Sequence, residues 1–138
     1  MRRLRPLGIA LVVIVAVLVV AGVAGFFAVA KAYRVPGDAM SPSLRAGDRI
    51  LVLRFGGPVD PDQGDIVAYR ASGARCGFPG TVVFVHRVAR VMRGGRFVVR
   101  GDNPARSCDS RVLGPVRRKD LIGQVVAVYW PPRHWGLR

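Results

Sequence analysis

Three side chains suited to acid–base chemistry lie in two short segments of this sequence. The first segment, "VHRV" (Val85–Val88), carries His86, and the second, "GDNPARSCDSR" (Gly101–Arg111), carries Asp102 and Asp109. A histidine has an ordinary pKa near 6.5 and can take up a proton at neutral pH, and a neighbouring carboxylate can fix its tautomer. Taken alone, His86 is more often an incidental histidine on a strand, so a role as general base depends on the other segments of the sequence.

Four segments in a fixed order carry more information than any one of them does. They are "GDAMSPSLRAGD" (37–48), "GDIV" (64–67) and the two segments above, trailed by "LIGQVV" (121–126). Together, behind one hydrophobic stretch, they resemble the type I signal peptidase family, the membrane-anchored serine proteases that remove signal sequences. The resemblance runs from the hydrophobic stretch to about Val128 and implies a fold and a site of that type.

The resemblance assigns roles to individual residues. Ala39 occupies the position of the serine nucleophile, and His86 occupies the position of the general base. Bacterial members of the family have lysine as the base, whereas the eukaryotic and sporulation-type branch works with Ser, His and Asp. The family pattern implies Asp109 as the first choice for the group that orients His86, and Asp102 as the second. A purely structural pair between Asp109 and Arg111 is the alternative.

Alanine at the nucleophile position removes the reactive group. Without a hydroxyl at Ala39 there is no proton for His86 to take and no oxygen to form an acyl-enzyme. The nearest serine, Ser41, lies two residues away, roughly 6–7 Å along an extended chain, so it is a poor substitute. The residues that flank position 39 are expected to contact substrate: Gly37, Asp38 and Met40.

Two functions fit these residues. The first is a signal-peptidase-like serine endopeptidase that cuts exported proteins after small residues at the outer membrane surface, impaired as written by Ala39. The second is a natural, non-catalytic pseudoprotease whose groove binds extended peptide segments at the membrane. The sequence alone does not decide whether the chain is an active enzyme, nor whether Ala39 is natural or introduced.

A hydrophobic stretch is expected to hold this site at a membrane. Residues 7–30 form 24 consecutive positions without a charge, roughly 36 Å as a helix, which is enough to cross a bilayer core of about 30 Å. The basic residues within 1–6 predict a cytoplasmic N-terminus and an extracytoplasmic domain. The alternative is a cleaved signal peptide, because "AVA" (Ala28–Ala30) has the form of a cleavage site.

The rest of the chain predicts an all-β fold, a small, mostly antiparallel domain over residues 31–130 with an irregular tail at 131–138. Runs rich in Val, Ile and aromatic residues alternate with turn-forming segments, and Gly94–Gly95 predicts a hairpin. The expected strands are Asp48–Phe55, Gly64–Arg70, Thr81–Val91, Arg96–Asp102 and Leu121–Trp130.

Composition bears on the partners of the domain. The net charge of +14 favours contact with anionic headgroups, whereas the scattered basic residues and the hydrophobic stretch argue against nucleic-acid binding. No spacing of ligands predicts a metal, and nothing predicts a cofactor. Cys76 and Cys108 form a disulfide or remain two free thiols, because the sequence does not report their separation.

Overall fold

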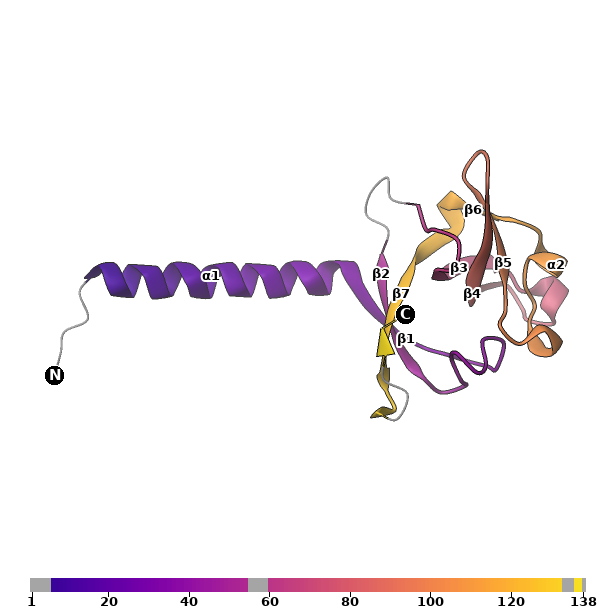
Figure 1. Cartoon of the computed structure of the whole chain (residues 1–138), viewed down its shortest axis with the longest axis horizontal. Coiled ribbons are helices and arrows are strands. Elements are labelled where there is room, and N and C mark those ends of the chain that lie inside the picture. The colour runs from indigo at the N-terminus through magenta and orange to yellow at the C-terminus, as the bar shows by residue number, and fades with distance from the viewer. Residues whose placement is uncertain (1–5, 55–59, 133–135, 138) are drawn as a thin grey trace.

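The computed structural model describes residues 6–54, 60–132 and 136–137 (Figure 1). Residues 1–5, which carry the arginines used to predict orientation, lie outside these ranges. The helices are α1 (Pro6–Val29) and α2 (Ser110–Leu113), with 3-10 turns at Ala74–Cys76, Pro104–Arg106 and Arg118–Asp120. The strands are β1 (Ala30–Arg34), β2 (Arg49–Arg54), β3 (Ile66–Ser72), β4 (Thr81–Met92), β5 (Arg96–Arg100), β6 (Val116–Arg117), β7 (Leu121–Trp130) and β8 (Gly136–Leu137).

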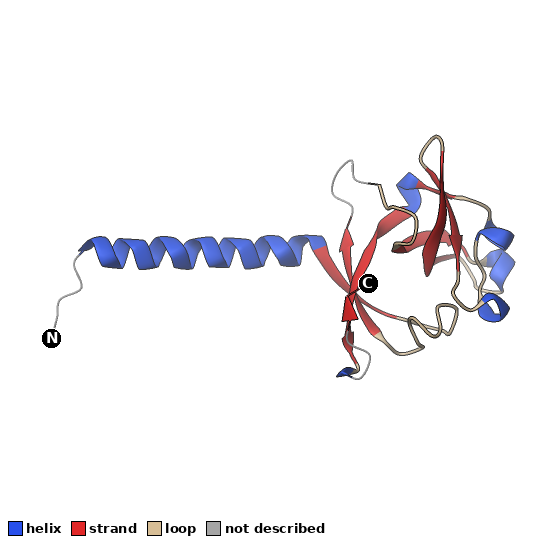
Figure 2. Ribbon diagram, viewed as in Figure 1, coloured by secondary structure: helices blue, strands red, loops and turns tan. Residues whose placement is uncertain are grey.

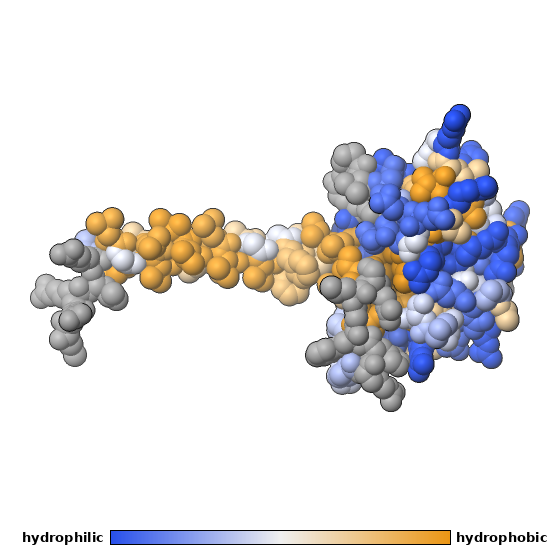
Figure 3. Space-filling model, viewed as in Figure 1, coloured by the Kyte–Doolittle hydropathy of each residue, from blue (hydrophilic) through white to orange (hydrophobic). Residues whose placement is uncertain are grey.

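Helix α1 stands away from the β domain and buries none of its residues (Figure 1). Its surface is apolar along its length, whereas much of the visible face of the domain is hydrophilic (Figure 3). Among the described residues it is the one helix long and apolar enough to cross a membrane. Its end continues directly into β1 at Ala30, so the anchor and the sheet are joined without a linker.

The strands form a single antiparallel sheet in the order β1-β2-β7-β3-β4-β5-β6, with β8 added beside β7 (Figure 2). Strand β3 is central, and its first four residues are all buried, because the curved sheet carries apolar side chains on both faces. Ile66 and Ala68 enter one core cluster, whereas Val67 and Tyr69 enter the other. The continuous apolar run of this strand therefore reflects burial on two faces.

The all-β prediction is confirmed, and each of the five expected strands is present within a few residues. Gly94 and Gly95 have φ of 77° and 68° in the turn between β4 and β5, a conformation that glycine adopts without strain. Strands β1 and β6 were not predicted. The prediction of an irregular end was wrong at 136–137, where the chain turns back and pairs as β8 with Ala127 and Val128.

Candidate active site

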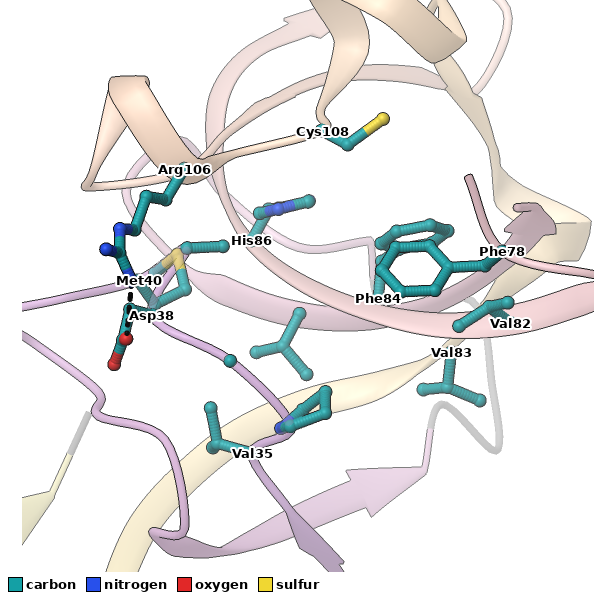
Figure 4. A pocket seen from close by; sticks show the side chains of 14 residues that line it. Val35, Asp38, Met40, Phe78, Val82, Val83, Phe84, His86, Arg106 and Cys108 are labelled. Carbon is teal, nitrogen blue, oxygen red and sulfur yellow. Dashed lines mark hydrogen bonds and ion pairs between the residues drawn. The ribbon is translucent and has the colours of Figure 1, made fainter. Parts of the chain in front are cut away.

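A pocket of about 330 Å³ lies between the chain that follows β1 and the first half of β4 (Figure 4). The segment Val35–Met40, which contains position 39, forms one side, and Val82–His86 forms the other. Phe78, Arg106 and Cys108 complete the lining. The fold therefore brings three of the segments singled out in the sequence to the same cavity, and position 39 and His86 lie more than 40 residues apart in the chain.

Core packing on one flank fixes the loop at position 39. Met40 and Leu44 are 1% and 0% exposed and belong to the main core cluster. The carbonyl of Ala39 accepts a hydrogen bond of 2.9 Å from the backbone N–H of Asn103. The backbone is thus held at position 39 from two directions, while the side chain offers the pocket only a methyl group.

The two serines that follow position 39 do not supply a hydroxyl to the pocket. Neither Ser41 nor Ser43 is among the residues that line it. The hydroxyl of Ser43 instead accepts a hydrogen bond of 3.3 Å from Arg87. The structure therefore gives no support to a nucleophile shifted along the loop.

His86 is 1% exposed and has a hydrogen-bond partner at each ring nitrogen. The phenol oxygen of Tyr69 lies 2.8 Å from Nδ1, and Oγ of Ser107 lies 3.2 Å from Nε2. The ring also packs against Phe84, with the centroids 6.0 Å apart. Burial lowers the pKa of His86 to about 4, although the carboxylate of Asp109 acts in the opposite direction. The ring is therefore neutral at physiological pH.

Asp109 is fully buried and is linked to His86 through the hydroxyl of Ser107. Its carboxylate accepts hydrogen bonds from Ser107 (2.9 Å), from the backbone N–H of Gly101 (2.9 Å) and from Arg111. Burial raises the pKa of Asp109, but the hydrogen bonds from Arg111, Gly101 and Ser107 outweigh it and hold that pKa well below its usual range. Asp109 also caps α2 and, through Ser107, reaches Nε2 of His86.

Asp102 points to another partner. Its two carboxylate oxygens accept hydrogen bonds of 2.9 and 2.7 Å from Arg87, the neighbour of His86 on β4. The hydrogen bond from Arg87 lowers the pKa of Asp102. The structure therefore brings Asp109 into the network of His86, and places Asp102 in an ion pair beside it.

Cys76 and Cys108 form a disulfide with a Cα–Cα distance of 5.9 Å. The bond ties the segment that carries Ser107 and Asp109 to the connection between β3 and β4. Cys108 also lines the pocket. The sequence left open a disulfide or two free thiols, and the structure has the disulfide.

The three residues expected to contact substrate all border the pocket, but in different ways. Gly37 and Asp38 are half-buried at its edge, whereas the side chain of Met40 is buried in the core. Asp38 forms an ion pair of 3.3 Å with Arg106 from the opposite side of the cavity (Figure 4). This pair joins the residue before position 39 to the residue before Ser107.

Sequence reasoning missed Tyr69 and Ser107. Ser107 stands two residues before Asp109 in the quoted "SCDSR" segment, so its place in the motif was a usable signal. Tyr69 had none, because its role depends on strand register. Val67 lies opposite His86, and Tyr69 is two residues further along the same face, in the diagonal position.

In the parts of the chain that the structure describes, no group of three His, Cys, Asp or Glu side chains is placed to hold a metal ion. His86 lines the pocket, and behind it a hydrogen-bonded network joins this neutral histidine to a phenol, a hydroxyl and a buried carboxylate. These are the components of acid–base and acyl-transfer chemistry, with the attacking oxygen missing.

Comparison with known proteins identifies the family. The model of the family described as "Signal peptidase, peptidase S26" matches residues 7–91 and 84–130. The chain belongs to this signal peptidase family. The match covers the helix, the position-39 loop, the β4 histidine and the last motif, so the resemblance seen in the sequence is confirmed.

Curated relatives of the chain agree with this assignment. It is 29% identical over 123 residues to mitochondrial inner membrane protease subunit 2 of Saccharomyces cerevisiae, covering 75% of this chain and 70% of that protein. It is 27% identical over 148 residues to signal peptidase I of Leptolyngbya laminosa, covering 78% and 72%. Mitochondrial inner membrane protease subunit 1 of Schizosaccharomyces pombe is 29% identical over 116 residues, covering 72% and 73%. This signal peptidase family member is thus a membrane protein of the processing-protease type.

Proposed function

We propose that the chain is a signal-peptidase-type endopeptidase for exported proteins whose cleavage step is blocked, as the sequence stands, by alanine at position 39. The observation that carries this proposal is the pocket itself. Ala39 and His86 line the same cavity, and the network behind His86 is complete, while the one missing component is the hydroxyl. Without that oxygen no acyl-enzyme can form.

The proposal includes a membrane topology. Helix α1 is a single span with its N-terminus in the cytoplasm, and the β domain lies on the outer face, as the basic N-terminal residues favour. Because β1 continues from α1 without a linker, the pocket stays close to the bilayer, where an exported precursor is still tethered. Lys31 and Arg54, both exposed at the α1 end of β1 and β2, are placed to meet anionic headgroups.

A second function rests on a separate observation, the free edge of β4. Strand β5 pairs with β4 only over Arg87–Met92, so within the described residues the edge of Thr81–His86 beside the pocket carries no strand. An extended peptide can add to such an edge through backbone hydrogen bonds. A natural pseudoprotease that binds peptides without cutting them would use this edge alone.

One substitution separates the two functions. Three full-length proteins in detergent are compared: the unmodified protein, Ala39→Ser and Ala46→Ser. Each is incubated with the same signal-peptide-bearing precursor. Ala46 is exposed in the same loop, so its variant adds a hydroxyl away from the pocket. We expect Ala39→Ser to raise the cleavage rate on the order of 10³-fold or more, because losing the nucleophile of a serine protease costs orders of magnitude.

The controls define what would contradict the proposal. The gain must disappear in Ala39→Ser with His86→Asn, and Ala46→Ser must stay at the starting rate. If Ala39→Ser gains nothing while the unmodified protein binds the same peptide, the endopeptidase proposal is wrong and the pseudoprotease function stands.

A further inference from the structure

The hydrogen atoms around His86 can be assigned by counting donors and acceptors, starting from Asp109. The pKa of this carboxylate is held far below neutrality, so it is ionised and can only accept hydrogen bonds. Ser107 must therefore use its single hydroxyl hydrogen on Asp109, at 2.9 Å. The contact of 3.2 Å between Ser107 and Nε2 of His86 then requires the proton to be on the nitrogen.

The count from the opposite end of the network starts at Tyr69. This tyrosine is fully buried, and among the described residues its phenol group has one hydrogen-bond partner, Nδ1 of His86 at 2.8 Å. A buried hydroxyl that donated to nothing would lose the energy of a hydrogen bond. The phenol therefore donates to Nδ1, and Nδ1 carries a lone pair. The two ends of the network independently require the same tautomer.

We propose that Tyr69 and Ser107 are positioning residues that hold His86 as the neutral tautomer with its proton on Nε2. In this state the ring acts as a donor toward Ser107, and its only lone pair is engaged by the phenol. Asp109 orients His86 indirectly, through its hydrogen bond with Ser107. Nε2 of His86 is thus a hydrogen-bond donor and has no lone pair with which to accept a proton.

The charges around the ring are consistent with a neutral histidine. Burial lowers the pKa of His86 first, and the positive charge of Arg111 on α2 lowers it further. The carboxylates of Asp109 and Asp102 act in the opposite direction, but each is engaged, by Arg111 and by Arg87. On the pocket side the charged groups are Asp38 and Arg106, which pair with each other.

The tautomer matters for catalysis because Nε2 lies on the side of position 39. Ser107 and the carbonyl of Ala39 both approach Gly101, which places them next to each other. This consequence rests on the proposed endopeptidase function. A hydroxyl introduced at position 39 must replace Ser107 as the partner of Nε2, and the ring proton must be on Nδ1. Tyr69 then turns its phenol oxygen to accept that N–H and loses the acceptor of its own hydrogen, a cost that the stronger hydrogen bond from the charged ring offsets once Nε2 takes the proton of the attacking hydroxyl.

The first test reads the tautomer directly and needs no activity. The imidazole nitrogens of the full-length Ala39 protein in detergent are labelled with ¹⁵N and observed by NMR at neutral pH, with His134→Gln used to assign the signals. We expect His86 to show a protonated Nε2 and an unprotonated Nδ1. A protonated Nδ1 would overturn the proposal, whatever the cleavage assays show.

The second test removes the phenol hydroxyl and keeps the ring. Tyr69→Phe deletes the donor that favours the neutral histidine, so the pKa of His86 should rise by about one unit in an NMR titration. Tyr129→Phe, a loss of the same hydroxyl from an exposed residue on β7, should leave it unchanged. A role for Tyr69 in packing alone would give equal titrations in both variants and would contradict the proposal.

The third test asks for the catalytic consequence. In the Ala39→Ser background, Tyr69→Phe should lower kcat on the order of 10-fold and leave KM unchanged, because the N–H at Nδ1 loses its acceptor while the pocket keeps its shape. Tyr129→Phe in the same background is the control. An unchanged kcat would remove Tyr69 from the mechanism even if the NMR tautomer were as expected.

Discussion

The two sides of the pocket are built by different forces. The loop side is held by apolar packing, with Met40 and Leu44 in the core and only a methyl group at Ala39. The β4 side is held by buried polar groups, in which His86 and Asp109 have all of their side-chain polar atoms hydrogen-bonded. The loop can therefore lose its reactive oxygen without losing its place, whereas no member of the polar network can be removed without leaving a partner unsatisfied.

This difference limits what the surviving residues prove. Asp109 caps α2 and holds the backbone of Gly101, so it has a structural reason to persist in a protein that cleaves nothing. The presence of His86 and Asp109 is therefore weaker evidence for activity than the shape of the pocket around position 39. The comparison predicts that changes on the polar side affect folding as well as chemistry, and that changes at position 39 affect chemistry alone.

The largest effect on stability is expected at Asp109. Asp109→Ala leaves the buried N–H of Gly101 and the hydroxyl of Ser107 without an acceptor, and should lower the free energy of unfolding by about 3–5 kcal/mol. Asp102→Ala is the matched control, because its ion pair with Arg87 is partly solvent-accessible and should cost about 1 kcal/mol or less. Denaturant titration of both variants in detergent measures the difference. Equal losses would show that Asp109 is no more structural than a surface carboxylate.

A somewhat smaller effect is expected from pH, through His86. Its folded pKa of about 4 lies below the unfolded value near 6.5, so the unfolded chain binds the proton first as the pH falls. Stability should be constant above about pH 6.5 and should decrease by about 3 kcal/mol between pH 6.5 and 4. The variant His86→Gln should lack this slope. A stability curve of the unmodified protein that is flat in this window would contradict the buried, neutral histidine.

The sequence predicted more of the fold than of the network. Apolar runs and turn residues suffice for the five long strands and the anchor, and the motif order suffices to bring His86 and position 39 together. The partner of Nδ1 was not predictable, because Tyr69 reaches His86 only through the register of β3 against β4. The choice between Asp102 and Asp109 also required coordinates. Asp102 is hydrogen-bonded to Arg87 and does not contact His86.

A moderate effect is expected where the two sides meet, at Gly101. A Cβ at this residue would collide with the side chain of Ser107 and come within 2.6 Å of the carbonyl of Ala39. Gly101→Ala should therefore destabilise the fold by about 1–3 kcal/mol and separate the two sides of the pocket. Gly37→Ala is the control, since a Cβ there meets nothing within 4 Å. Denaturant titration should distinguish the two variants, and equal losses of stability would mean that the sides are not in contact at Gly101.

The smallest effect is expected from the ion pair that spans the mouth of the pocket. Arg106 and Asp38 have side chains 70% and 41% exposed, so Arg106→Ala should change the free energy of unfolding by less than about 0.5 kcal/mol. Because the pair bridges the entrance, breaking it should instead raise the affinity for an uncharged extended peptide. High salt weakens such exposed pairs, so it should raise the affinity of the unmodified protein and leave that of Arg106→Ala unchanged. The same salt response in both proteins would contradict this prediction. It would show that the ion pair between Arg106 and Asp38 does not limit access to the pocket.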